Sequence, residues 1–176
     1  NPYYLTYLQL IVHQDDEKIK SLTDAKGKRV GTLKNALSER VLQAEEGIEI
    51  VSYEDDINSF SDLENHRIDG VFLDAPVIMY YAGENDKLKT VGPPVGQMMY
   101  GIVTRKSDTK LLNEINFALD KIAKSGKLRE IYDRWNLWNP YLAAHFEDPN
   151  PTKIPPVMYH YFLESSGKHK TYWDKI

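Results

Sequence analysis

The sequence contains no cysteine. This absence excludes disulfide bonds, cysteine-based zinc sites and a thiol nucleophile within these residues. No apolar run approaches the length needed to cross a bilayer, so we expect no transmembrane helix in them. A basic block is also missing, because the 22 Lys and Arg are scattered among 26 acidic residues and the formal net charge is -4. This charge pattern argues against a nucleic-acid-binding surface.

The residues that are present have the balance of a globular chain. Of the 176 residues, 41% are hydrophobic and 27% are charged, and the length fits one ordinary domain with an appendage. The sequence begins Asn1-Pro2-Tyr3 rather than with methionine. We therefore expect a fragment or a processed chain, and the missing signal peptide says little about location.

The segment 67–81 combines a predicted strand, an acid and the start of a predicted helix. Gly70 to Leu73 is a short apolar run that predicts a buried strand, and Asp74 follows it directly. Pro76 suits the start of the next helix. An acid at the carboxyl end of a core strand lies where open α/β sheets bind ligands. Asp is also a favoured helix cap, and from this segment alone capping is the stronger interpretation.

Strand and helix patterns alternate from residue 28 to 91, which predicts an α/β fold with a parallel-rich sheet and helices on both faces. Ser38 is expected to cap the helix after the strand 27–33, and Ser59 to Asp62 to open the following helix as a capping box. The stretch 92–96, Gly-Pro-Pro-Val-Gly, predicts a rigid connector between two strands. We expect Trp135 and Trp138 to anchor the last helix to the core.

The C-terminal stretch 139–176 differs in composition from the rest. It holds five of the nine prolines and many aromatic residues, without a long helical or strand period. We predict an irregular, extended segment that packs on another surface. A plain linker or disordered end is the alternative, although linkers are rarely so aromatic.

Five short motifs occur together in a characteristic order. They are Pro2-Tyr3-Tyr4, the runs Ser21 to Gly31 and Arg67 to Asp74, the run Tyr100 to Val103, and the run Gly126 to Trp135. Together they resemble the extracytoplasmic solute-binding proteins (family 3, type II periplasmic binding fold) of polar amino-acid ABC transporters. The resemblance covers residues 1–138. The main portion of the first lobe of such a protein has no counterpart among these residues.

The resemblance implies a two-lobed "Venus flytrap" architecture. Residues 1–13 would form a hinge strand, 14–96 the second and smaller lobe, 97–138 the return to the first lobe, and 139–176 an extension or linker. The implied hinge positions are Pro2, Tyr3, Tyr4, Gln97 and Met98.

The resemblance also implies a ligand site. An acid at the position of Asp74 takes the α-ammonium group of an amino acid in this family. The turn Asn35-Ala36-Leu37-Ser38 would hold the α-carboxylate through backbone N–H groups, helped by the helix dipole. Family members have a Gly-Thr-Thr-like turn there, so in this chain the hydroxyl contact is lost or displaced to Ser38. No cofactor, metal or catalytic residue is implied.

The expected function is the binding of an amino acid outside the cytoplasmic membrane and its delivery to an ABC permease. The run Lys34 to Leu42 and Trp135-Asn-Leu-Trp138 also resemble binding domains that are fused to their permease. This predicts a periplasmic or extracytoplasmic, membrane-tethered protein with the permease after Ile176. Alone, the fragment is expected to dimerise through exposed apolar surface.

Two other functions stay open. One is a ligand-sensing domain of a signalling receptor, which the sequence after Ile176 would distinguish. The other is a periplasmic enzyme, since cyclohexadienyl dehydratases resemble these binders; the candidates for its general acid or base are Asp74 and Glu39.

No metal site is predicted from spacing in the sequence. The five histidines show no metal-ligand spacing. The adjacent acids Asp15-Asp16 and Asp55-Asp56 are expected to be solvated.

Overall fold

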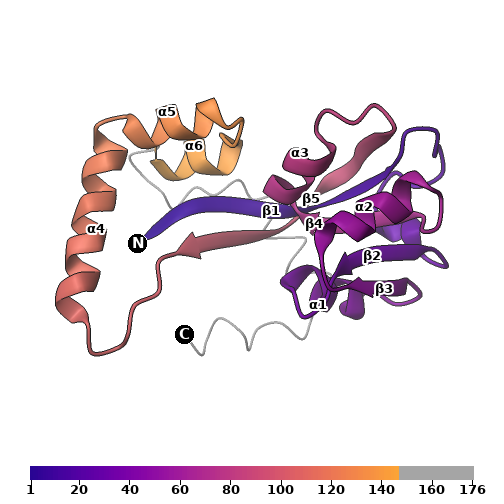
Figure 1. The fold of residues 1–176 in the computed structure, drawn as a ribbon, viewed down its shortest axis with the longest axis horizontal. Coiled ribbons are helices and arrows are strands. Elements are labelled where there is room, and N and C mark those ends of the chain that lie inside the picture. Colours follow the sequence, from indigo (N-terminus) through magenta and orange to yellow (C-terminus); the bar gives the residue numbers. More distant parts are fainter. Residues whose placement is uncertain (147–176) are drawn as a thin grey trace. The chain divides into compact units, whose positions relative to one another are not determined.

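The computed structural model describes residues 1–146. They divide into two compact units, one formed by residues 1–6 and 97–146 and the other by Tyr7–Gly96 (Figure 1). The chain passes between the units after Thr6 and after Gly96. That residues 2–4, 97 and 98 act as a hinge remains a prediction. Most of the predicted extension, residues 147–176, lies outside the described residues.

Five strands form one mixed sheet, in the order β3-β2-β4-β1-β5. The strands are β1 (Pro2–His13), β2 (Arg29–Leu33), β3 (Glu49–Tyr53), β4 (Gly70–Asp74) and β5 (Leu88–Gly101). β2 pairs in parallel with β3 and with β4, whereas β1 is antiparallel to β4, with Leu8 opposite Asp74. The predicted α/β fold with a parallel-rich sheet is therefore confirmed.

The helical elements of the unit Tyr7–Gly96 are a 3₁₀ turn, η1 (Leu22–Ala25), and the helices α1 (Leu37–Ala44), α2 (Asp56–Glu64) and α3 (Ala75–Ala82). Val71 and Leu73 alternate with Phe72 along β4, and all three are buried, because both faces of this strand are covered. One core cluster joins β4 to apolar residues of α2 and α3: Ile11, Phe60, Leu63, Ile68, Val71, Leu73, Ile78, Ala82 and Leu88.

The predicted capping box at Ser59 to Asp62 is wrong. α2 begins one turn earlier, at Asp56, where the side chain of Asp55 accepts a hydrogen bond of 3.0 Å from the Asn58 N–H. Ser59 lies inside the helix, is fully buried and donates to the carbonyl of Asp56 at 2.7 Å. The hydroxyl is thus satisfied within the turn, and the earlier acid provides the cap.

The predicted connector 92–96 is also wrong, because these residues lie within β5. β5 is an edge strand of the sheet, a position where proline is tolerated. Gly92 adopts a positive φ of 72°. The side-chain amide of Gln9 donates to the carbonyls of Val91 at 2.8 Å and Gly92 at 3.1 Å, so a buried side chain of β1 holds the distorted part of β5 in place.

The unit formed by residues 1–6 and 97–146 contains α4 (Thr109–Lys124), α5 (Lys127–Arg134) and α6 (Pro140–Phe146). Its core is built on the start of β1, α5 and α6: Tyr4, Leu5, Tyr132 and Leu142. Trp138 packs against this core with the Arg129 guanidinium 4.0 Å above its ring, as an anchor should. Trp135 is 66% exposed, so the predicted anchoring role is wrong for this residue.

Helix α6 was not expected, since the stretch from residue 139 was predicted to be extended. The start of α6 is defined by a capping side chain and by a proline in the first turn. The side-chain carbonyl of Asn139 accepts from the N–H groups of Tyr141 at 2.9 Å and Leu142 at 3.1 Å, and Pro140 occupies the first turn. Leu142 is then fully buried, so tertiary packing stabilises a helix of only seven residues.

The helix α4 contrasts with α6, because it has no buried residue. Leu111, Phe117 and Ile122 are 47%, 73% and 37% exposed. Among residues 1–146, no helix is both long enough and apolar enough to cross a bilayer.

We predict that Leu142→Ala destabilises the unit that contains α6. Removing a fully buried leucine side chain costs about 2–5 kcal/mol, through lost burial and the cavity that remains. Denaturant unfolding followed by circular dichroism measures the change. Phe117→Ala, at a side chain on α4 that is 73% exposed, is the control and should shift the midpoint little. Equal effects of the two substitutions would show that α6 does not pack as described.

Candidate ligand-binding edge

The carboxyl ends of β2 and β4 lie at the same edge of the sheet, because the two strands are parallel neighbours. Gly31 is paired with Val71, and the same register places Lys34, just after β2, level with Asp74 at the end of β4. Neighbouring strands are about 4.8 Å apart. Two helices, α1 and α3, also begin at this edge. Their N-termini bring partial positive charge to it.

Asp74 is the last residue of β4 and the residue that precedes α3. Its side chain is half-buried and makes no capping hydrogen bond to α3. Pro76, in the first turn, has no N–H and thus removes one donor that a capping carboxylate would use. Asp74 therefore occupies the cap position without performing the cap's hydrogen bonding.

A second carboxylate lies near Asp74. Burial raises the pKa of Asp56, and the charges of Asp74 and then Asp55 raise it further. One carboxylate oxygen of Asp56 is buried without a hydrogen-bond partner among the described residues, so the prediction that this acid is solvated is wrong. The edge around Asp74 is consequently electronegative and favours a cationic group.

The turn Asn35 to Ser38 joins β2 to α1, and Ala36 is the N-cap residue. Asn35 has a positive φ of 60°, and its N–H donates to the carboxylate of Glu39 at 2.7 Å. The Ala36 N–H donates to the carbonyl of Leu33 at 3.3 Å. Alanine has no side-chain acceptor for the first-turn amides. The N–H groups of Leu37 and Ser38 are therefore the donors that this helix start can offer to an anion.

The predicted N-cap role of Ser38 is wrong, because Ser38 lies inside α1 and is fully buried. Its hydroxyl oxygen accepts a hydrogen bond of 2.7 Å from the hydroxyl of Thr32 on β2. This contact explains the burial of a serine at the strand–helix junction. What Ser38 offers at the edge is its backbone N–H.

Glu39 fixes the turn, a role that the sequence interpretation missed. Its carboxylate accepts from the Asn35 N–H and from the hydroxyl of Ser52 on β3. The hydrogen bond from Ser52 chiefly lowers the pKa of Glu39, with smaller contributions from the Asn35 N–H and the charge of Lys34. A glutamate at the third helical position commonly reaches back in this way. Its position three residues after Ala36 was the available signal.

The sequence matches the family of bacterial extracellular solute-binding proteins, family 3, over residues 1–137. The chain belongs to this family. It is 34% identical over 140 residues to a putative ABC transporter arginine-binding protein 2 of Escherichia coli (strain K12), covering 76% of this chain and 57% of that protein. The L-cystine-binding protein TcyJ of the same strain is 30% identical over 137 residues, with 76% and 52% covered.

Solved structures show the same fold. An ancestral arginine-binding protein bound to glutamine is 32% identical and superposes with a TM-score of 0.70, covering 78% of this chain and 63% of that one. The chain thus spans little more than half the length of the curated relatives it matches. These relatives are binding proteins, not enzymes.

We predict that the stabilising effect of the Glu39 carboxylate depends on pH. The folded state lowers the pKa of Glu39 from its ordinary 4.5, so its contribution is fully present above that value and is lost as the pH falls through the lowered pKa. Glu39→Gln should therefore lower the melting temperature at neutral pH, and the difference from the wild type should shrink in acid. Thermal melts from neutral pH to about pH 3 measure it. A difference independent of pH would contradict the assignment.

Proposed function

We propose that this protein binds an amino acid outside the cytoplasmic membrane and delivers it to an ABC permease. One observation carries the proposal: a carboxylate and a helix N-terminus with available amides follow two neighbouring strands at a single sheet edge. Asp74 would take the α-ammonium group. The N–H groups of Leu37 and Ser38 would take the α-carboxylate, aided by the dipole of α1.

The spacing of the two groups suits a zwitterion. β4 and β2 are neighbours, about 4.8 Å apart, so the acid at the end of one and the amides after the other would meet the two charged groups of one α-amino acid head group. A half-buried carboxylate needs a cationic partner more than an exposed one does, because it has lost part of its hydration. The same edge would bind a simple amine less well, since the α1 amides would then be left without an acceptor.

Binding experiments with a panel of amino acids would identify which ligand side chain the protein prefers. The relatives described above are named for arginine and cystine, so both belong in a first panel. Asp56 adds negative charge near Asp74 and would favour a ligand with a further cationic group.

The remaining parts of the proposal concern the whole protein. Two lobes would close over the ligand about a hinge at residues 2–4 and 97–98, with the ligand favouring the closed state. The permease would recognise this state. We place the protein outside the cytoplasmic membrane and tethered to it, with the permease following Ile176 in the same gene. A gene that continues into a kinase or cyclase instead would refute the delivery function and leave the binding function intact.

Residues 1–176 produced alone should self-associate as dimers. The reason is the apolar side of α4, where Leu111 is 47% and Ile122 37% exposed. Light scattering after gel filtration measures the mass. Leu111→Ser should reduce the dimer fraction, whereas Lys110→Ser, on the polar side of the same helix, should not. A monomer at high concentration would contradict the proposal.

We predict that Asp74→Asn abolishes amino-acid binding by the full-length protein. The substitution removes the charge with little change in shape and strands the ligand's ammonium group, which costs about 3–5 kcal/mol, or a loss of roughly 100- to 1,000-fold or more in affinity. Calorimetric titration with the amino-acid panel measures it. The unliganded melting temperature should change little, because Asp74 makes no capping hydrogen bond to α3.

Asp86→Asn is the matched control, since Asp86 is exposed and lies outside the edge. It should bind as the wild type does. Wild-type affinity in Asp74→Asn would overturn the proposed ligand site. A lower melting temperature without loss of affinity would show that Asp74 serves the helix alone.

A further inference from the structure

Two histidines that are distant in sequence meet at the other edge of the sheet. β1 runs antiparallel to β4, with Ile11 opposite Val71, so the end of β1 lies beside the start of β4. His13 is the last residue of β1, and His66 lies in the turn that leads from α2 into β4. This edge is separated from Asp74 by the length of β4, about 13 Å for four steps of about 3.3 Å. It is therefore distinct from the proposed amino-acid site.

The two imidazole rings are in contact, with centroids 3.9 Å apart and planes at 38°. The carboxylate of Asp15 also reaches His13, whose Nδ1 it contacts. Ligand atoms of His13, Asp15 and His66 all lie within 4.8 Å of one another. In a tetrahedral zinc site the ligand atoms are about 3.4 Å apart, as follows from metal–ligand distances of about 2.0–2.1 Å. Small rotations of these side chains would bring them to that geometry.

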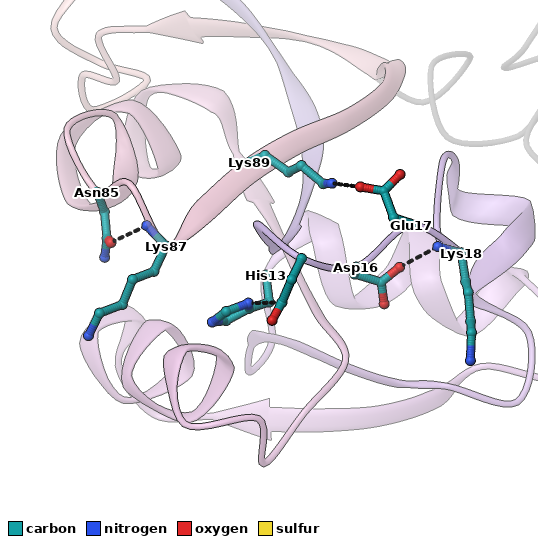
Figure 2. A network of polar contacts seen from close by, with 8 residues as sticks. His13, Asp16, Glu17, Lys18, Asn85, Lys87 and Lys89 are labelled. Carbon is teal, nitrogen blue, oxygen red and sulfur yellow. Dashed lines mark hydrogen bonds and ion pairs between the residues drawn. The ribbon is translucent and has the colours of Figure 1, made fainter.

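The turn that carries Asp15 is held by its own hydrogen bonds. Figure 2 shows His13 together with the following residues of this turn, where Asp16 accepts from the Lys18 N–H at 2.7 Å and from the Ile19 N–H at 2.8 Å. The Gln14 N–H donates to the carbonyl of Lys87 at 2.6 Å. The backbone on both sides of Asp15 is thus fixed, and its carboxylate is presented beside His13 at little further cost in entropy.

The charges nearby suit a cation. Two lysines that Figure 2 labels are paired with acids: Lys87 with Glu64 at 3.6 Å, and Lys89 with Glu17 at 3.3 Å. Asp15 and His66 are exposed, which leaves room for a water molecule as a fourth ligand and a path of entry.

We propose that His13, Asp15 and His66 form a binding site for a divalent transition-metal ion. Two imidazoles and one carboxylate match Zn²⁺, and Mg²⁺ or Ca²⁺ would prefer oxygen ligands. A bound ion would join the turn after β1 to the turn before β4, and so would stabilise the unit Tyr7–Gly96 without taking part in amino-acid binding. A stacked histidine pair with a hydrogen-bonded aspartate, and no metal affinity, is the competing explanation.

The test is a calorimetric titration of the untagged chain with zinc chloride at neutral pH, with magnesium chloride in parallel. We expect one Zn²⁺ site and no heat from Mg²⁺. His66→Asn should weaken Zn²⁺ binding at least about tenfold, since even changes to groups behind a metal ligand cost 10- to 100-fold. Asparagine tolerates the positive φ of 55° at this position, so the turn should be retained. Asp15→Asn, at a side chain 72% exposed, provides a second variant with little risk to folding.

His145→Gln removes a histidine outside the cluster and is the matched control. It should bind Zn²⁺ as the wild type does, and so should Asp74→Asn, which separates this site from the amino-acid site. Zn²⁺ should raise the melting temperature of the wild type and not that of His66→Asn or Asp15→Asn, while all should melt alike in chelator. Absence of a stoichiometric site in the wild type, or unchanged affinity in both cluster variants, would overturn the proposal.

Discussion

The parallel pairing of β2 with β4 is the constraint on which the rest of the structure depends. It aligns the carboxyl ends of the two strands, and thereby places Asp74 and the start of α1 at one edge. The same register faces Val71 and Leu73 toward α2 and α3. A shift by one residue would turn these side chains to the opposite face and move Asp74 out of line with the turn after β2. Close packing holds the register: a Cβ on Gly31 would lie 2.8 Å from Ile68 Cδ1. Core and candidate site are therefore specified together.

β2 and β4 could be predicted from the sequence because apolar runs and their bounding turns are local signals. β5 could not, because the glycines and prolines at 92–96 indicated a connector and not a continuous edge strand. The starts of α1 and α2 could not, because each contains more than one residue able to cap. Ser38 and Ser59 have good capping chemistry, yet both are fully buried and hydrogen-bonded within the fold, so the caps fall at Ala36 and Asp55. For both serines, burial within the fold outweighed the local preference of serine for an N-cap position. For α6 the opposite holds, since the pair Asn139-Pro140 was a sufficient signal and was overlooked.

The residues of the candidate sites also differ in whether local sequence or the folded sheet decides their position. Asp74 could be predicted because its position depends on one strand and one helix that are adjacent in sequence. The pairing of Glu39 with Ser52 depends on the β2–β3 contact, and the meeting of His13 with His66 depends on β1 lying beside β4. The order β3-β2-β4-β1-β5 is not encoded in any short segment. Spacing rules for metal ligands detect sites within one element, and they could not detect this cluster.

The turn before α1 would not need a side-chain hydroxyl to hold the anion proposed for it. A helix start offers more N–H groups than it can satisfy internally, and two of those at this turn are used by Glu39 and by the carbonyl of Leu33. Glu39 brings a negative charge close to the place proposed for a carboxylate, which taken alone would weaken binding. Its carboxylate is, however, occupied by Asn35 and Ser52, and Lys34 lies near enough to lower its pKa. The result is a turn already fixed in shape, so a ligand would not have to order it, and the amides of Leu37 and Ser38 would bind the proposed carboxylate at a smaller entropic cost.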